Sequence, residues 1–280
     1  MPDSICICGA GTMGSGIAQS AAQHGIPVIL YDLDPAKLSR AWLQIEKDLQ
    51  QQVVKKRIRF DDKKEIIHRI RFTTVISECQ AGIVLEAIVE NTEAKVSLFT
   101  ALEKLNGFDT LFVSNSSSLS IKAIAERTAF PDRIMGMHFF NPATRMKLVE
   151  IIRTDHSNEA SVQRIRDLAV LMGKTPVICK DDPGFIVNHV ARPFYLEALR
   201  LAEKGIADIE TIDKLAEAAG FKMGPFHLMD LIGNDINYTV SCSLYEAMGR
   251  PERLKPSPLQ EAKVKQGEFG RKSGRGFFDN

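Results

Sequence analysis

Hydrophobic positions in the first two thirds of the chain occur as short uninterrupted runs, with longer amphipathic stretches between them. Short apolar runs are typical of strands buried on both faces, whereas apolar residues three and four apart are typical of helices. We predict strands over residues 5–8, 28–32, 83–88, 111–115, 133–139, 148–152 and 176–179. The intervening helices include one that ends at residue 24, one that begins at residue 35, and the segments 92–105 and 158–172. This alternation predicts an α/β fold with a mainly parallel sheet covered on both faces.

The strand pattern stops after the sequence Asp181-Asp182-Pro183-Gly184. Five helical segments follow, over residues 185–203, 208–219, 225–232, 235–248 and 258–266, and glycine comes after several of them, at 205, 220 and 249. Pro193 lies inside the first of these segments and is expected to kink or break it. The chain is therefore predicted to form two domains, an α/β domain over residues 1–182 and a C-terminal all-helical domain over 183–280.

Composition and charge limit the partners and the cellular compartment expected for this protein. The chain has 280 residues and a formal net charge of +1, which favours neither nucleic acid nor a membrane surface as a partner. No apolar run approaches the roughly 18 residues of a membrane span, and the N-terminus shows no cleavable signal, so we expect a cytoplasmic protein. Five cysteines without CxxC spacing agree with this and predict no metal site. Cys6 and Cys8 share one face of a strand, which indicates core packing.

A glycine motif between the first strand and the first helix indicates a dinucleotide site. Gly9, Gly11 and Gly14 are spaced as GxGxxG, in which the glycines permit a tight turn, close approach of a pyrophosphate and close helix packing. Asp32 ends the second strand, where a carboxylate can bind the ribose 2′-hydroxyl and repel a 2′-phosphate. The motif therefore predicts a Rossmann-type domain that binds NAD rather than NADP.

Two other interpretations of the glycine motif stay open. Such a turn can occur in an α/β domain that binds no nucleotide. A flavin is the second alternative, although the predicted helical domain lacks the strands that flavoproteins of this class usually carry.

His138 and Glu150 are the candidate catalytic pair. His138 lies at the end of one apolar strand, and Glu150 lies in the middle of the next. A buried carboxylate needs a partner, and an imidazole on a neighbouring strand can supply it. A histidine held in this way is a proton acceptor with a fixed tautomer. A purely structural ion pair is the alternative.

Two polar motifs follow other predicted strands. Hydroxyls and an amide occupy residues 114–120, at the carboxyl edge where open α/β sheets bind ligands. This cluster can also be a helix cap, in which Ser118 or Ser120 would serve. The second motif runs from Glu86 to Lys95, and its Glu90 and Lys95 can be an ordinary surface pair.

Taken together, these motifs closely resemble the L-3-hydroxyacyl-CoA dehydrogenase family, including its 3-hydroxybutyryl-CoA dehydrogenases. The resemblance covers essentially the whole chain. No hydratase-like domain precedes these motifs, so the monofunctional form is expected. The segments that carry the resemblance are 9–14 with Asp32, 86–90, 114–119, 138–142, 147–150, 182–188, 223–226 and 270–277. One departure is Ser116, where relatives often have Thr, and the hydroxyl is kept.

The resemblance implies a role for each matching residue. His138 would be the catalytic base and Glu150 its orienting carboxylate, while Ser117 and Asn188 would bond the reacting oxygen of the substrate. Asn188 can instead be a polar residue on a helix, where it caps the helix or is solvated. The residues assigned to the NAD cofactor are Gly9, Gly11, Thr12, Met13, Gly14, Asp32, Glu90, Lys95, Asn115, Ser117, Asn141 and Lys272.

The resemblance also implies a coenzyme A thioester as substrate and a homodimer formed through the helical domain. A basic run at residues 55–64 is usually a solvated face, but Lys55 and Lys56 are candidates for binding the phosphates of the coenzyme. The expected activity is oxidation of L-3-hydroxyacyl-CoA to 3-ketoacyl-CoA, and the reverse, in fatty-acid or butanoate metabolism.

Two rival functions remain. One is a dehydrogenase of similar architecture that acts on a small hydroxy acid or sugar acid without CoA, but such proteins typically place a lysine where this chain has His138. The other is a nucleotide-binding structural or sensor protein that has lost catalysis. The presence of every catalytic residue type argues against it.

Overall fold

The computed structural model describes residues 4–279. The described residues up to Asp182 form one compact unit, and those from Pro183 form a second. No helix among residues 4–279 combines the length and the apolar character that crossing a bilayer requires.

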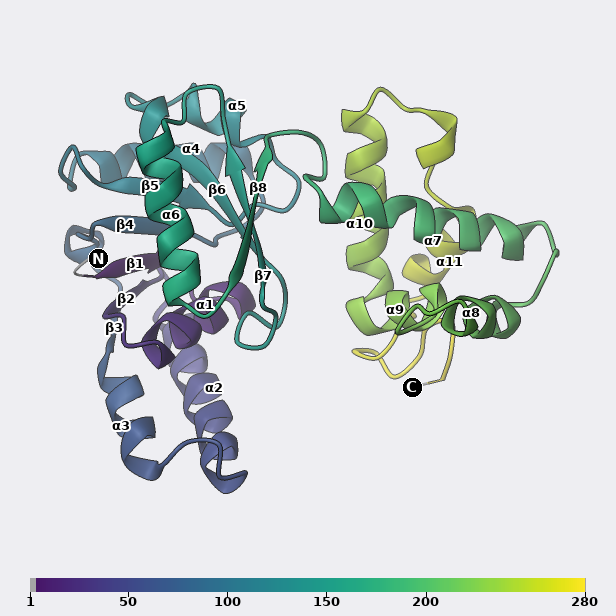
Figure 1. Cartoon of the computed structure of the whole chain (residues 1–280), viewed down its shortest axis with the longest axis horizontal. Coiled ribbons are helices and arrows are strands. Elements are labelled where there is room, and N and C mark those ends of the chain that lie inside the picture. The colour runs from purple at the N-terminus through teal and green to yellow at the C-terminus, as the bar shows by residue number, and fades with distance from the viewer. Residues whose placement is uncertain (1–3, 280) are drawn as a thin grey trace. The chain divides into compact units, whose positions relative to one another are not determined.

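The first unit is built on one eight-stranded sheet (Figure 1). The strand order is β3-β2-β1-β4-β5-β6-β7-β8, and neighbouring strands are parallel except β6 and β7, which are antiparallel. The strands are β1 (Ile5–Cys8), β2 (Val28–Tyr31), β3 (Ile70–Thr73), β4 (Ile83–Glu86), β5 (Leu111–Ser114), β6 (Ile134–Phe139), β7 (Leu148–Arg153) and β8 (Thr175–Lys180). The predicted mainly parallel sheet is confirmed.

The sequence pattern missed one strand of this sheet. β3 lies at the edge of the sheet, next to β2, and only its two end residues are buried, while Arg71 is exposed and Phe72 is partly buried. An edge strand need not be apolar on every position, because one side of it meets solvent. Its pattern is therefore weaker than that of the buried central strands.

Helices cover both faces of the sheet. They are α1 (Thr12–Gln23), α2 (Pro35–Val54), α3 (Phe60–His68), α4 (Thr92–Glu103), α5 (Ile121–Ala125) and α6 (Glu159–Leu171). Ile5 and Ile7 of β1 share one core cluster with residues of α1 and α6. On the other face, Phe99 of α4 contacts Phe112 of β5 edge to face, with ring centroids 5.7 Å apart. In Figure 1, α6 accordingly lies in front of the sheet and α4 behind it.

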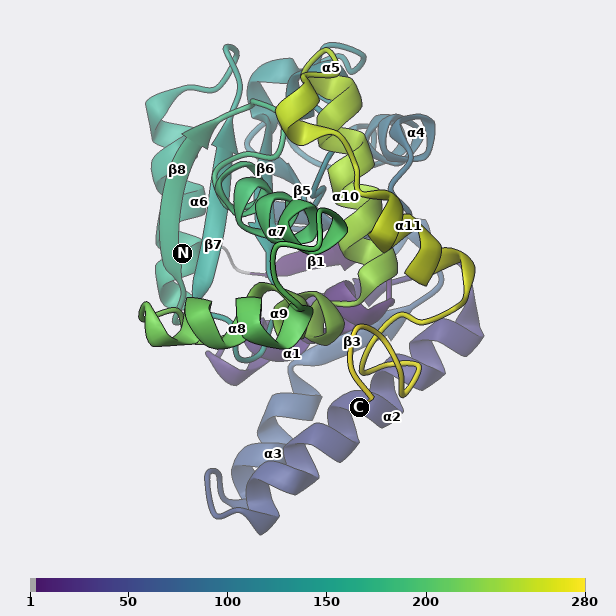
Figure 2. The same cartoon turned by 90° about the vertical axis from the view of Figure 1, so that its right-hand side faces the viewer.

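The second unit is all-helical over the residues described, 183–279 (Figure 2). Its helices are α7 (Val187–Glu203), α8 (Ile209–Ala218), α9 (Pro225–Ile232), α10 (Asn234–Ala247) and α11 (Pro258–Lys265). Leu196, Leu199, Phe226 and Met229 are at the centre of a separate core. Pro193 lies inside α7 without breaking it, because the missing N–H costs one hydrogen bond while the rest of the helix stays intact.

Candidate active site

The glycine motif forms a tight turn between β1 and α1. Gly9 has a φ of +107°, and a Cβ there would lie 2.5 Å from the carbonyl oxygen of Ala87. A Cβ on Gly14 would lie 1.7 Å from the carbonyl oxygen of Gly9. The protein's own packing therefore requires glycine at both positions. At Gly11 a Cβ would meet no atom within 4 Å, so the space over its backbone is open to a ligand.

Asp32 follows β2 directly and is bonded to the glycine loop. Its Oδ2 accepts a 2.8 Å hydrogen bond from the backbone N–H of Ala10, and its Oδ1 accepts one of 3.0 Å from that of Asp34. The carboxylate is 8% exposed. A carboxylate has about four acceptor sites, so these two bonds fix Asp32 beside the loop and leave acceptor capacity for a hydroxyl.

A pocket of about 660 Å³ lies beside the start of α1. Thr12 and Asn141, two residues assigned to the cofactor, both line it, whereas Met13 packs against the hydrophobic core. α1 has no side-chain N-cap, so its first backbone N–H groups are available to an anion. Lys37 and Arg40 also line the pocket, although no sequence motif indicated them. Both lie on the first turns of α2, just after Asp32, and this position is the sequence feature that could have indicated them.

A buried ion pair lies under the carboxyl ends of β4 and β5. The Nζ of Lys95 is 2.7 and 2.8 Å from the two carboxylate oxygens of Glu86, and both side chains are at most 1% exposed. Ser114, which pairs with Glu86 in the strand register, donates a 2.6 Å bond to the same carboxylate. Lys95 also lies 3.2 Å from Glu90. The alternative of a surface pair is therefore wrong for Lys95, because its ammonium is enclosed by two carboxylates.

Glu90 holds the serine-rich loop. Its Oε1 accepts bonds from the hydroxyl of Ser116 at 2.6 Å and from the backbone N–H groups of Ser117 at 2.9 Å and Ser118 at 3.1 Å. Burial opposes ionisation of Glu90, but the ammonium of Lys95 and the Ser116 hydroxyl outweigh it and keep the pKa of Glu90 below its ordinary value. The carboxylate is therefore charged and fixes the backbone around Ser117.

The same loop is fixed at its two ends. Ser120 caps α5 by accepting from the N–H of Ala123, as expected for one of the two candidate cap residues. At the other end, Oδ1 of Asn115 accepts a 2.9 Å bond from the backbone N–H of Phe139. Asn115 thereby links the loop to the strand residue that follows His138.

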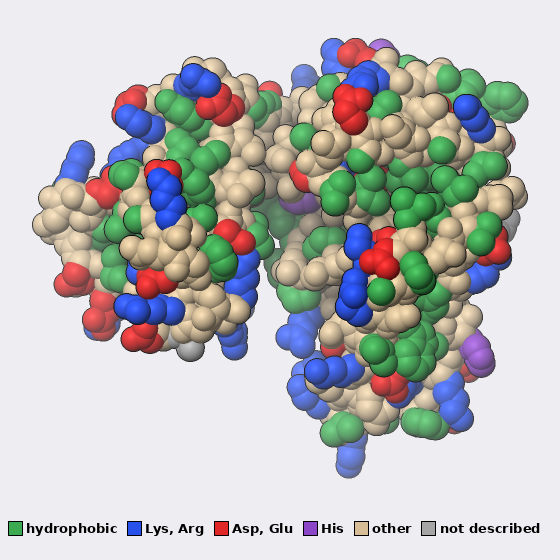
Figure 3. Space-filling view, turned by 180° about the vertical axis from the view of Figure 1, so that it is seen from behind, with side chains coloured by type: hydrophobic (Ala, Val, Ile, Leu, Met, Phe, Trp, Pro, Cys, Tyr) green, Lys and Arg blue, Asp and Glu red, His purple; other side chains and the backbone are tan. Residues whose placement is uncertain are grey.

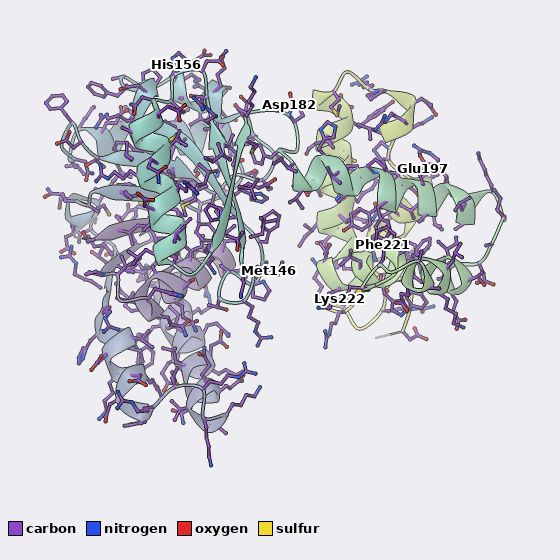
Figure 4. The ribbon with its side chains drawn as sticks, viewed as in Figure 1. Met146, His156, Asp182, Glu197, Phe221 and Lys222 are labelled. Carbon is purple, nitrogen blue, oxygen red and sulfur yellow. The ribbon has the colours of Figure 1, made fainter. Side chains whose placement is uncertain are left out.

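His138 and Glu150 are directly opposite each other on neighbouring strands. The register of β6 and β7 pairs them, and Nδ1 of His138 lies 2.8 Å from Oε2 of Glu150. Their exposed fractions are 6% and 1%. The side chains at the ends of this strand pair, Met146 before β7 and His156 after it, are labelled in Figure 4. The sequence expectation that the two strands are neighbours and that their His and Glu meet is confirmed.

Two of the predicted site residues belong to the second unit. Asn188 lies in the first turn of α7. Lys272 lies near the C-terminus and is paired with Asp235. Their assigned roles toward substrate and cofactor remain predictions.

Lys55 and Lys56 lie between α2 and α3, which form a helical hairpin in contact with α1. Both lysines are exposed, and Lys56 has a φ of +55°. Lys and Arg side chains are frequent along this hairpin (Figure 3). Their role as contacts for CoA phosphates stays a prediction.

The fold and the site together define a class of protein. A glycine loop with a paired acidic residue is the binding element for a dinucleotide, and a buried His–Glu pair on the same sheet can accept and return a proton. This combination is that of a nicotinamide-dependent oxidoreductase.

Comparison with known proteins gives the family. Residues 4–182 match the model of the 3-hydroxyacyl-CoA dehydrogenase NAD binding domain, and residues 184–280 match that of the 3-hydroxyacyl-CoA dehydrogenase C-terminal domain. The chain therefore belongs to the 3-hydroxyacyl-CoA dehydrogenase family. The predicted family and its NAD cofactor are confirmed.

Three relatives illustrate the range within this family. The chain is 41% identical to the Escherichia coli K12 3-hydroxyadipyl-CoA dehydrogenase over 99% of its own length, but spans only 58% of that protein. It is 39% identical to the human mitochondrial hydroxyacyl-coenzyme A dehydrogenase, covering 98% of this chain and 90% of the relative. Among solved structures, the chain resembles the crystal structure of (S)-3-hydroxybutyryl-CoA dehydrogenase PaaH1 from Ralstonia eutropha, with a TM-score of 0.94 and 33% sequence identity. The match covers 100% of this chain and 99% of that one.

Proposed function

We propose that this protein interconverts L-3-hydroxyacyl-CoA and 3-ketoacyl-CoA with NAD, in fatty-acid or butanoate metabolism. The observation that carries the proposal is the buried, cross-strand pair of His138 and Glu150 in a sheet that also carries the glycine loop and Asp32. Oxidation of a secondary alcohol requires a base for the hydroxyl proton, and this pair is suited to that task.

Each residue of the proposed site has a distinct part in the reaction. The loop 9–14 and Asp32 would hold NAD, which supplies the hydride acceptor. His138 takes the hydroxyl proton during oxidation and returns it during reduction. Glu150 stabilises the imidazolium that forms, as a carboxylate does for histidine in hydrolytic triads. Ser117 and Asn188 bond the reacting oxygen, and Glu90 keeps the backbone of Ser117 in place.

The rival functions make different demands on the same residues. A hydroxy-acid dehydrogenase of related architecture would use a lysine base, and Lys95 cannot serve because Glu86 encloses its ammonium. A sensor protein without catalysis would have no need of a buried imidazole oriented by a carboxylate, since burying such a pair is costly.

The decisive experiment is an assay with acetoacetyl-CoA and NADH. We expect NADH absorbance to fall with time, and little oxidation of NADPH under the same conditions. A folded protein that binds NADH without oxidising it would contradict the proposed activity and favour the sensor function.

The acyl group, the assembly and the location belong to the same proposal. The relatives are named for 3-hydroxybutyryl-CoA and for 3-hydroxyadipyl-CoA, so both substrates should be assayed. We propose that the protein is cytoplasmic and forms a homodimer through the helical unit, and light scattering would test the dimer.

We also propose that Lys55 or Lys56 binds the phosphates of CoA. Substituting Lys55 and Lys56 by Ala should raise KM for the CoA substrate and leave kcat unchanged.

A further inference from the structure

Arg192 of α7 is a buried cation with neutral partners. It is 3% exposed. Its Nη1 donates to the backbone oxygen of Asn237 at 2.9 Å and to the hydroxyl of Ser241 at 2.9 Å, both on α10. Its Nε donates to the backbone oxygen of Asn188, one turn earlier on α7, at 3.3 Å. These acceptors are uncharged, and so is the fourth, the side-chain oxygen of Asn237 at 3.2 Å from Nη1.

Among the residues that the structure describes, no carboxylate lies within ion-pair distance of Arg192. Arg200, on the same helix, pairs with Glu197, which Figure 4 labels on α7. Burial lowers the pKa of Arg192 to about 10, which still leaves the guanidinium charged at neutral pH. A buried charge without a counterion is strongly unfavourable, so an anion from outside the chain would stabilise the guanidinium of Arg192.

A second buried donor lies beside the guanidinium. Asn237 is 1% exposed, and its Oδ1 accepts from Nε2 of Gln260 and from Arg192, but its Nδ2 has no partner. Gln260 Oε1 is also without one, and a water next to the anion would satisfy it. The guanidinium uses Nε and Nη1 for the bonds above, and its fork has five N–H groups in all. A planar carboxylate suits such a set of donors.

The position of Arg192 relative to Asn188 indicates which carboxylate. The guanidinium folds back toward Asn188, the residue to which the proposed function gives the reacting oxygen at C3. The Nε of this guanidinium lies 3.3 Å from the backbone oxygen of Asn188. The four bonds from that oxygen to the terminal carboxyl carbon of a six-carbon acyl chain span roughly 5 Å. A short dicarboxylic acyl chain whose reacting oxygen is bonded to Asn188 can therefore bring its carboxylate to the guanidinium.

We propose that Arg192, together with Asn237, binds the terminal carboxylate of the acyl chain, so that the substrate class is the CoA thioester of a six-carbon 3-hydroxydicarboxylic acid. This inference rests on the proposed function. Arg192 is then the specificity-determining residue, and chains that end in a methyl group leave its charge unpaired.

The test compares two six-carbon substrates that differ only at the far end, 3-oxoadipyl-CoA and 3-oxohexanoyl-CoA. The native protein should prefer the dicarboxylic substrate by about 10- to 100-fold in kcat/KM, the usual worth of hydrogen bonds to a charged group. Equal kcat/KM values for the two would overturn the inference while leaving the proposed activity standing. Failure to reduce 3-oxoadipyl-CoA, 3-oxohexanoyl-CoA and acetoacetyl-CoA would overturn both.

Variants locate the preference in Arg192. Arg192→Met should abolish the preference by lowering kcat/KM for 3-oxoadipyl-CoA more than kcat/KM for 3-oxohexanoyl-CoA. Arg200→Met on the same helix is the matched control and should keep the preference. If Arg192→Met does not fold, Arg192→Lys retains the charge without the fork and should retain part of the preference. An Arg192 variant that folds and keeps the full native preference would show that the group only joins α7 to α10.

Discussion

The first unit contains two buried pairs of a carboxylate with a basic group, and they differ in what the basic group can do. Lys95 meets both oxygens of Glu86 and lies close to Glu90, so three oxygens of two carboxylates surround its ammonium. His138 is bonded to Glu150 through Nδ1, and an imidazole has a second ring nitrogen through which it can exchange a proton. The first pair joins α4 to β4, and the second joins the neighbouring strands β6 and β7. Burial of an ion pair therefore does not identify a catalytic base, and the chemistry of the basic group decides.

The largest expected effect is on catalysis and comes from disrupting the His138–Glu150 pair. His138→Gln should lower kcat by roughly two to four orders of magnitude, because a general base contributes that much, and should leave NADH binding nearly unchanged. Steady-state kinetics and NADH fluorescence titration measure the two effects. His156→Gln is the matched control, since His156 also contacts a carboxylate, that of Glu126, but is partly exposed. A variant at 138 with native kcat would make the His138–Glu150 pair structural.

The second prediction concerns the buried pair of Lys95 and Glu86. Lys95→Met should lower the free energy of unfolding by about 3–5 kcal/mol, because it leaves the carboxylate of Glu86 buried without its cation. Urea denaturation followed by circular dichroism gives this value. Lys104→Met, at the exposed end of α4, should cost far less. Similar losses from the two substitutions would show that Lys95 is not the partner that Glu86 requires.

Asp32 is also a buried carboxylate of the first unit. Unlike Glu86, it is bonded to backbone N–H groups rather than to a cation at short range. Asp32→Ala should reduce the preference for NADH over NADPH by about 10- to 100-fold, because a hydrogen-bond acceptor for the ribose and a charge that repels a 2′-phosphate are both lost. The ratio of kcat/KM for the two nucleotides measures this. An unchanged ratio would assign ribose recognition to other residues, of which Lys37 and Arg40 are the first to test.

The smallest effect concerns Glu90, which lies between the Lys95 cluster and the serine loop. Because the pKa of Glu90 is lowered in the folded protein, its carboxylate stabilises the fold above its ordinary value, 4.5, and this contribution fades as the pH falls through the folded-state pKa. Glu90→Gln should therefore flatten the acid side of the plot of Tm against pH. Superimposable acid limbs for the variant and the native protein would count against this linkage.

Local features of the site followed directly from the sequence. The glycine spacing and the acid after the second strand identified the nucleotide loop, because a turn of this kind depends on residues close together in the chain. The apolar runs gave seven of the eight strands, and β3 was missed because its exposed positions hide the pattern. The all-helical character of the second unit followed from helical periodicity and the glycines after its helices.

The fold class, the family and the types of group at the site follow from the amino-acid sequence. Which of these groups meet depends on the tertiary structure. Sequence left His138 and Glu150 as a conditional pair until the antiparallel register placed them opposite each other. It left Lys95 as a possible surface residue, and it gave no sign that Arg192 is buried on α7 against α10. The physical reason is that propensity and periodicity are local, whereas burial and pairing depend on register and packing between segments far apart in the chain.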